Sequence, residues 1–391
     1  MATYNYEDLA KKYDNFTVPS VSITVNGKDI TKAKGKGISD IDIELTSGYE
    51  ASIASFVLYD MYDREKSKFL TEDADKFIAL GSSVDIGLGY GGNNFHVFCG
   101  IITRVNFFVE DEKAPGVRVT CMDVKSIMMA NNHSKQLTAK TYSAAVKEIF
   151  ESGVYAALKD NNVVSKYIVT DTPDAQAAGG GGGAGGGGGQ DKASDRTIEF
   201  VAESDYEFVV RAAKRYNFDF FALYNVVYFR PAKSNADVLF TLTPKSRAFH
   251  SFNLEYDITG LVETVEARGM NTGEAKAISE KVSFNNSISL GSKAKKYISK
   301  TEKVYVDPSI TSAAEAKARA ESIMENISYR FGTMEAELNG IPQMAPGNYV
   351  EIKEFGKATE NKYYITNVHH TLDNDGGFVT KIIGKVNKIG E

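Results

Sequence analysis

APGNYVEIKEFGKATENKYYITNVHHTLDNDGGFVTKIIGKV, residues 345–386, reads as one small β unit near the end of the chain. A Pro-Gly turn comes first, and Asn348–Glu354 then alternates polar and apolar residues, which is typical of a half-exposed strand. Lys362–Thr371 is rich in Tyr, Ile, Thr and Val and predicts a second strand. A cluster of Asp, Asn and Gly permits the positive φ of a tight turn before the closing strand Phe378–Val386.

Short alternating segments also fill the first third of the chain. They are Val18–Val25, Ile38–Leu45, Ala54–Tyr59, Val84–Tyr90, Phe95–Phe107 and Gly116–Asp123. Turn residues separate them, so the pattern predicts a barrel or a sandwich. Cys99 and Cys121 each lie in an alternating apolar run, and we expect two buried thiols on neighbouring strands rather than a disulfide framework.

The middle of the chain mixes helices and strands. Thr141–Phe150 and Ala202–Tyr216 have apolar residues at helical spacing, and Ser204 is a candidate cap of the second helix. The run 179–189 is glycine except for Ala184, so it cannot pack and predicts a flexible surface loop or a stand-in for one. A phosphate-binding loop is disfavoured, because no Lys-Ser or Lys-Thr follows the glycines.

These patterns predict a mainly β fold with an α+β insert. We expect an amino-terminal arm at 1–17, a first β unit at 18–135, an α/β insert at 136–244, and a second β unit at 245–391 with a helix at 312–329. Ser312 and Glu315 form the capping-box pattern that opens this helix.

Three groups of residues resemble one known family. They are the ending quoted above, the strand series of the first β unit, and Glu203–Pro231, with ESDYEF, RAAKRYNF and YNVVYFRP. Together they resemble the late control gene D family, the baseplate hubs of contractile phage tails, and Glu203–Pro231 is also similar to a segment of type VI secretion spike proteins.

The resemblance implies two tube-like β-barrel domains flanking the α/β insert. It implies a homotrimer, a ring in which six barrels match a sixfold tail tube. The implied partners are the tail tube protein, other baseplate proteins and a separate spike protein, since only about five residues follow the final strand. The implied location is a virion or tail-like particle, assembled in the bacterial cytoplasm.

Two other functions stay open at this stage: a carbohydrate- or receptor-binding β protein and a cell-wall hydrolase. The 21 Tyr and 22 Phe could stack on sugars, but Trp is absent. The candidate acids Glu203, Asp205, Glu207 and Asp219 fit a helix start better than a catalytic pair. His369 and His370 point to opposite faces of a strand and cannot form one site.

Composition sets further bounds. The 391 residues carry a formal net charge of -6, with 42% hydrophobic and 25% charged residues. This balance gives no general attraction to nucleic acid or anionic lipid. No apolar run is long enough to span a membrane, and the first residues lack the pattern of a secretory signal. We assign no catalytic residue, cofactor or metal.

Four aromatic residues of the closing stretch are candidates for an interface between chains: Tyr349, Tyr363, Tyr364 and Phe378. Strand alternation places Tyr363 and Tyr364 on opposite faces. We therefore expect one to pack inside its barrel and the other to face outwards, towards a partner chain or the channel.

Overall fold

The structure is a computed structural model that describes residues 3–31, 37–71, 78–111, 114–130, 132–172, 198–271, 275–284, 292–373, 375 and 377–390. The Gly-rich run 179–189 lies outside the described residues, so its predicted role as a loop stays a prediction.

The prediction of a mainly β fold with an α+β insert is confirmed, because thirteen strands join in one large sheet. In chain order its strands are β1 (Pro19–Val25), β2 (Lys28–Asp29), β3 (Ile38–Thr46), β4 (Ile53–Leu58), β7 (Ser83–Tyr90), β8 (Asn93–Phe108), β9 (Gly116–Met122), β15 (Val238–Leu242), β16 (Phe249–Tyr256), β20 (Gly332–Asn339), β21 (Tyr349–Ile352), β22 (Asn361–Asp373) and β23 (Gly377–Val386).

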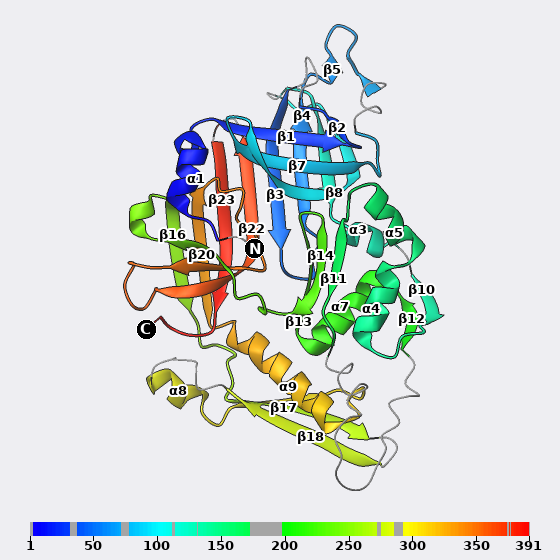
Figure 1. Ribbon diagram of the computed structural model, residues 1–391, viewed down its shortest axis with the longest axis vertical. Helices are drawn as coiled ribbons and strands as arrows, with labels where there is room; N and C mark the ends of the chain where they lie inside the picture. Colours follow the sequence, from blue (N-terminus) through cyan, green and yellow to red (C-terminus); the bar gives the residue numbers. More distant parts are fainter. Residues whose placement is uncertain are drawn as a thin grey trace.

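The sheet is a single path in the order β16-β20-β23-β22-β3-β4-β9-β8-β7-β1-β2, and β21 and β15 branch from β22. Its ladders are antiparallel except for the parallel pair β15–β21. Strands β1 and β7 cross in front of β3 and β4, so the sheet bends over itself (Figure 1). Among the described strands, β16 and β2 are the two ends of the path and do not pair with each other.

The two β units expected at 18–135 and 245–391 meet in one ladder, which we call the seam. There β22 pairs with β3, with a register that runs from Asn367 opposite Thr46 to Leu372 opposite Ile41. Strands from both units therefore belong to the same sheet, and one hydrophobic core spans both.

Alternation along the strands explains this core. In β3 and β20 every second side chain is buried for most of the strand. Cys121 is 0% exposed and Cys99 is 5% exposed, and the strands that carry them, β9 and β8, are neighbours. The prediction of two buried thiols is confirmed.

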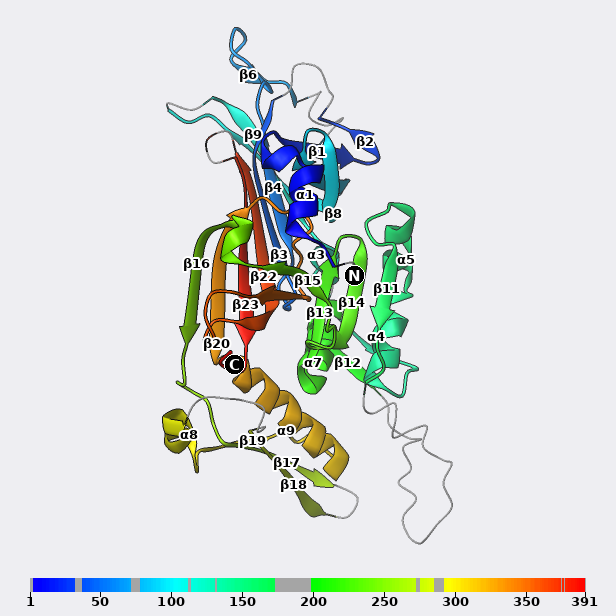
Figure 2. The same ribbon diagram turned by 60° about the vertical axis from the view of Figure 1, so that its left-hand side comes forward.

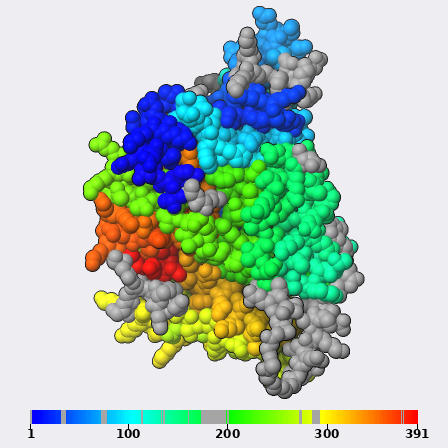
Figure 3. Space-filling model, viewed as in Figure 1, coloured from blue at the N-terminus to red at the C-terminus, as the bar shows by residue number. Residues whose placement is uncertain are grey.

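Residues 3–17 of the expected arm pack on this core and lie against the rest of the chain (Figure 3). They form α1 (Tyr6–Lys12) and a short turn of helix, η1 (Asp14–Phe16). Tyr13 is 1% exposed, and the Tyr13 hydroxyl accepts a hydrogen bond from the Gln343 side-chain amide at 2.5 Å. The Tyr6 hydroxyl accepts one from the Asn339 amide at 2.7 Å.

The α/β insert has its own hydrophobic core. Its elements are α3 (Lys125–Met128), β10 (His133–Gln136), α4 (Tyr142–Phe150), α5 (Gly153–Asp160), β11 (Lys166–Val169), β12 (Glu199–Glu203), α7 (Asp205–Tyr216), β13 (Phe218–Leu223) and β14 (Val226–Pro231). Strands β11, β14 and β13 form a three-stranded sheet, and α4, α5 and α7 lie beside it (Figure 2). Ser204 caps α7, as its position predicted, and Thr141 caps α4.

A smaller layer lies beyond the main sheet and has a third core. It contains β17 (Thr264–Asn271), β18 (Lys276–Ser283), β19 (Glu302–Val306), α8 (Ser292–Ile298) and α9 (Ala313–Ser328). Helix α9 lies across β17 and β18, with Ala316, Ala320 and Ile327 buried, and Ser312 caps its start. The remaining short elements are β5 (Tyr62–Asp63), β6 (Lys68–Phe69) and η3 (Pro244–Ser246).

Candidate functional site

The four predicted interface residues contact other parts of this chain. Tyr363, Tyr364 and Phe378 are 0%, 2% and 5% exposed, and Tyr349 is half-buried. Tyr363 belongs to the main core, and its hydroxyl donates to the Thr359 carbonyl at 2.6 Å. Phe378 also joins that core, beside the ring of Tyr90.

The burial of Tyr364 within its own chain contradicts one expectation. Alternation does separate it from Tyr363, but the expectation that one of the two faces out of the chain is wrong. The Tyr364 hydroxyl donates to the carboxylate of Asp219 on β13, so the insert of the same chain covers this side of β22. Strand alternation tells which residues share a face, and it does not tell what covers that face.

Asp219 and Tyr364 are part of a junction where the insert, α9 and the closing strands meet. Burial raises the pKa of Asp219, and burial also raises the pKa of Glu325 on α9. Lys233 lies 4.6 Å from the ring centre of Tyr329, and the Tyr329 and Tyr349 hydroxyls are 3.4 Å apart. The junction is filled by these side chains and holds three parts of the chain together.

The Pro-Gly turn that opens the closing stretch docks on the insert. Gly347 has φ +78°, and a Cβ there would lie 2.6 Å from the ring of Phe221. Arg230 donates to the Gly347 carbonyl at 2.6 Å. This turn therefore needs glycine for two reasons: its left-handed backbone and its close contact with Phe221.

The acids that invited a catalytic interpretation are held by structural contacts. Glu203 forms a two-point contact with Arg211, with N–O distances of 2.6 and 3.2 Å. The Asp205 carboxylate accepts a hydrogen bond from the Tyr155 hydroxyl at 2.6 Å. Glu207 completes the capping box of α7, and its hydrogen bonds with Ser204 lower its pKa.

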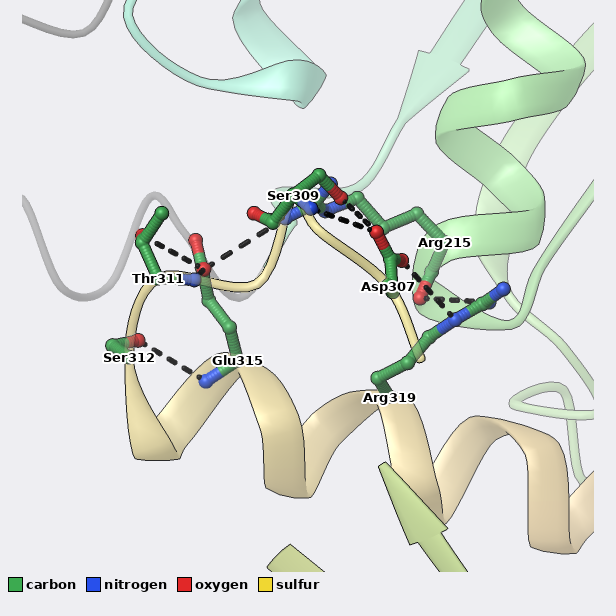
Figure 4. A network of polar contacts seen from close by, with 7 residues as sticks. All are labelled: Arg215, Asp307, Ser309, Thr311, Ser312, Glu315 and Arg319. Atoms are coloured by element: carbon green, nitrogen blue, oxygen red, sulfur yellow. Dashed lines mark hydrogen bonds and ion pairs between the residues drawn. The ribbon is translucent and has the colours of Figure 1, made fainter. Parts of the chain in front are cut away.

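A polar network joins the end of α7 to the start of α9 (Figure 4). Arg215 donates to the Ser309 carbonyl at 2.9 Å and lies 3.7 Å from the Glu315 carboxylate. Arg319 lies 3.8 Å from Asp307 and donates to the carbonyl of Lys214. Each cation is thus matched by an acid or a carbonyl, which fixes the small layer against the insert.

Sequence reasoning missed a fully buried lysine at the base of the insert. The Lys125 ammonium donates to the carbonyls of Glu50 and Gly48 at 2.7 and 3.1 Å, and it lies 5.0 Å from the ring centre of Phe220. Burial lowers the Lys125 pKa to about 8, and Asp123 and Glu50 oppose that shift. No sequence pattern marked it, because its carbonyl partners are about 75 residues away.

One face of the main sheet is polar and crosses the seam. A row of directly paired residues runs over five strands: Glu44, His369, Lys381, Glu337 and Ser251. A second row continues from Asp42 through Ser55 and Thr120 to Arg104 in the first β unit. A hollow of about 510 Å³ opens on the first row.

The two neighbouring histidines lie on opposite faces of β22, as predicted. His369 faces the polar side, where its Nε2 lies 2.9 Å from Asp42 and that contact raises its pKa. His370 is fully buried, which lowers its pKa to about 3. Its Nδ1 lies 2.9 Å from the Thr380 hydroxyl, so it packs as a neutral residue of the interior.

Comparison with solved structures finds the same fold in phage tail proteins. The tail protein of Neisseria meningitidis MC58 matches with a TM-score of 0.63 and 13% identity, over 96% of this chain and 98% of that one. The 43 kDa tail protein of prophage MuSo2 from Shewanella oneidensis matches with a TM-score of 0.64 and 12% identity, over 94% and 98%.

A type VI secretion component shares the fold as well. The c3393 protein of E. coli matches with a TM-score of 0.53 and 10% identity, over 94% of this chain and 78% of that one. The fold of this chain is therefore that of phage tail proteins and their relatives, over nearly its whole length.

The comparisons of sequence are more limited. The family described as the Alg8 N-terminal domain matches residues 15–172, less than half of the chain. That range ends before α7, β13 and β14, which complete the core of the insert. No curated protein matches the sequence. No helix in the described ranges is both long and apolar enough to cross a membrane.

Proposed function

We propose that this chain is a structural baseplate hub protein of a contractile tail or a related injection particle. Three copies form a ring that adapts the sixfold tail tube to a separate threefold spike. The proposed partners are two further copies, the tail tube protein, the spike protein and other baseplate proteins. The proposed location is the baseplate of a virion or tail-like particle, assembled in the bacterial cytoplasm.

The observation that carries this proposal is the shared fold with tail proteins over almost the full length of both chains. The shared fold includes the insert and the small layer. Similarity over all of these parts favours a similar structural role in an assembly more strongly than similarity of a single barrel would. The motifs of the closing stretch and of Glu203–Pro231 add to it.

The sheet itself also favours assembly. Strand β16 has eight residues and pairs on one side only, with β20, in the part of the chain that the structure describes. An open edge of this length is a site for unwanted pairing, and closure of a ring covers such edges. The polar face that crosses both β units suits a water-filled channel.

A non-catalytic role fits the contacts of the candidate acids. Glu203, Asp205 and Glu207 are engaged in an ion pair, a buried hydrogen bond and a helix cap. Asp219 is closed inside the junction by Tyr364. These contacts leave the acids in structural roles, and we propose that the chain acts by assembly rather than by turnover of a substrate.

The mass of the purified chain tests the proposal. We expect light scattering to give three times the 42.7 kDa chain mass, with rings visible by electron microscopy at the same concentration. Because ring closure depends on concentration, the measurement covers a dilution series. A chain that stays monomeric at high concentration, alone and with a tail tube protein present, would contradict the proposal.

A further inference from the structure

Three side chains with metal-binding atoms meet on the polar face at the seam. They are Asp42 and Glu44 on β3 and His369 on β22, and one donor atom from each lies within 4.8 Å of the other two. The His369 Nε2 and the Asp42 Oδ2 are 2.9 Å apart. Over the described ranges, this is the one group of three such residues.

The backbone holds these donors in place. Asp42 and Glu44 are two residues apart on a strand, so they share a face. Glu44 lies directly opposite His369 in the ladder. Both strands are interior to the sheet, since β4 flanks β3 and β23 flanks β22. Donors on paired interior strands keep their spacing better than donors on loops.

The donor set selects a class of ion. Imidazole nitrogen with two carboxylates suits first-row transition ions, whereas Ca²⁺ and Mg²⁺ take oxygen ligands. Bonds of about 2.0–2.2 Å to a common ion place adjacent donors roughly 3 Å apart. The 2.9 Å between His369 and Asp42 already has this spacing.

The surroundings leave room for an ion. The Asp42 side chain is 49% exposed and that of His369 is 32% exposed, and Glu44 and His369 line the hollow on this face. Lys381 lies opposite His369 on its other side, and its ammonium is 3.2 Å from the Glu337 carboxylate. The Lys381 ammonium thus pairs with an acid on β20.

We propose that Asp42, Glu44 and His369 bind one divalent first-row transition ion, such as Zn²⁺ or Co²⁺, across the seam. The ion would link β3 to β22, and so the amino-terminal and carboxy-terminal parts of the main sheet. An ion that binds the folded chain and not the unfolded chain stabilises the fold by mass action. This site belongs to the single chain and does not depend on the proposed hub function.

The test uses the full chain after removal of metal with a chelator. We expect Co²⁺ to bind at one ion per chain with visible absorption bands, and Zn²⁺ to raise the thermal midpoint. His369→Ala and Glu44→Gln should each lower the affinity at least tenfold. His250→Ala is the matched control, because His250 lies on the edge strand β16, which β20 and β23 separate from β22, and is 3.6 Å from Glu337. It should leave binding unchanged.

A fourth variant reports on the charge beside the site. Lys381→Ala removes a cation that lies opposite His369, so it should strengthen Co²⁺ binding without adding a donor atom at that position. The proposal fails if the wild-type chain shows no saturable binding up to about 1 mM ion. It also fails if His369→Ala binds as tightly as the wild type, because the ion is then held elsewhere.

Discussion

Lys125 is a lysine without access to water, and its charge makes the stability of the fold depend on pH. Its folded-state pKa, about 8, is below the ordinary value of 10.5. Between these values the unfolded chain holds more protons than the folded chain, so stability rises with pH. This gain in stability is fully present above the unfolded-state pKa of Lys125, and it is lost as the pH falls through the folded-state pKa.

We therefore predict that Lys125→Met changes the pH profile of unfolding. From pH 7.5 to 9.5 the wild type should gain about 2 kcal/mol relative to this variant, as the two pKa values require. Denaturant unfolding at both pH values measures the gain. Lys147→Met, at an exposed lysine, is the control for the loss of one positive charge. Parallel profiles of the wild type and Lys125→Met would contradict the prediction.

The two buried tyrosines of β22 give a second prediction. Tyr363→Ala and Tyr364→Ala should each destabilise the single chain by roughly 3–5 kcal/mol, as expected for a lost buried aromatic. Tyr364→Phe keeps the ring and removes the donor to Asp219, which should cost about 1–3 kcal/mol. Unfolding at a concentration where the chain is monomeric checks all three. A variant of Tyr364 that weakens assembly but not folding would show that a partner chain contacts this residue.

Residue-level expectations succeeded where the cause is local. The buried thiols followed from alternation within each strand. The cap at Ser204 followed from its position at the start of a helical pattern, and the cap at Ser312 followed from a four-residue pattern. The partner of Tyr364 did not follow, because Asp219 is 145 residues away. The grouping of Asp42, Glu44 and His369 was missed for the same reason: His369 and Asp42 are 327 residues apart.

Helix α7 shows how a single cap acts on a whole element. The Ser204 hydroxyl accepts from the Glu207 amide at 3.1 Å, and the Glu207 carboxylate accepts from the Ser204 amide at 2.7 Å. We predict that Ser204→Ala lowers the free energy of unfolding by about 1 kcal/mol, whereas Ser204→Gly lowers it by a few tenths. A Ser204→Ala variant as stable as the wild type would mean that the cap hydroxyl contributes little.

We predict that the Gly-rich run 179–189 is dispensable for folding. Its composition supplies no apolar side chain larger than alanine, and changes in loop length cost little. Replacement by a short Gly-Ser linker should leave the thermal midpoint nearly unchanged, as a calorimetric scan would measure. A large fall in the midpoint would show that the run packs against the rest of the chain.

Most strands and helices could be predicted because their burial is one-sided. The closing stretch was placed within a few residues of β21, β22 and β23, since its turn residues separate clear alternating runs. The order of strands in the sheet could not be predicted in this way. Alternation gives the face of each strand, while hydrogen-bonded neighbours are set by packing between distant segments.

At the scale of the whole molecule, two β units in the sequence become one sheet. The reason is the ladder between β3 and β22, which joins the units edge to edge. Two separate barrels would each need to close on themselves, whereas here each unit covers one edge of the other. The predicted bounds 18–135 and 245–391 therefore follow the order of the chain, and they do not predict the ladder that the two units share.

The place of β22 in the sheet also bears on how the chain is synthesised. Strand β22 leaves the ribosome long after β3, yet the two strands pair in the interior of the sheet. Until then β3 has an uncovered edge, and pairing over such a sequence separation is slow. Until β22 pairs, the nascent amino-terminal part therefore exposes the edge of β3, and other chains can pair with it. We expect chains released before β22 to aggregate, and a chaperone that shields edges to raise the yield of folded protein.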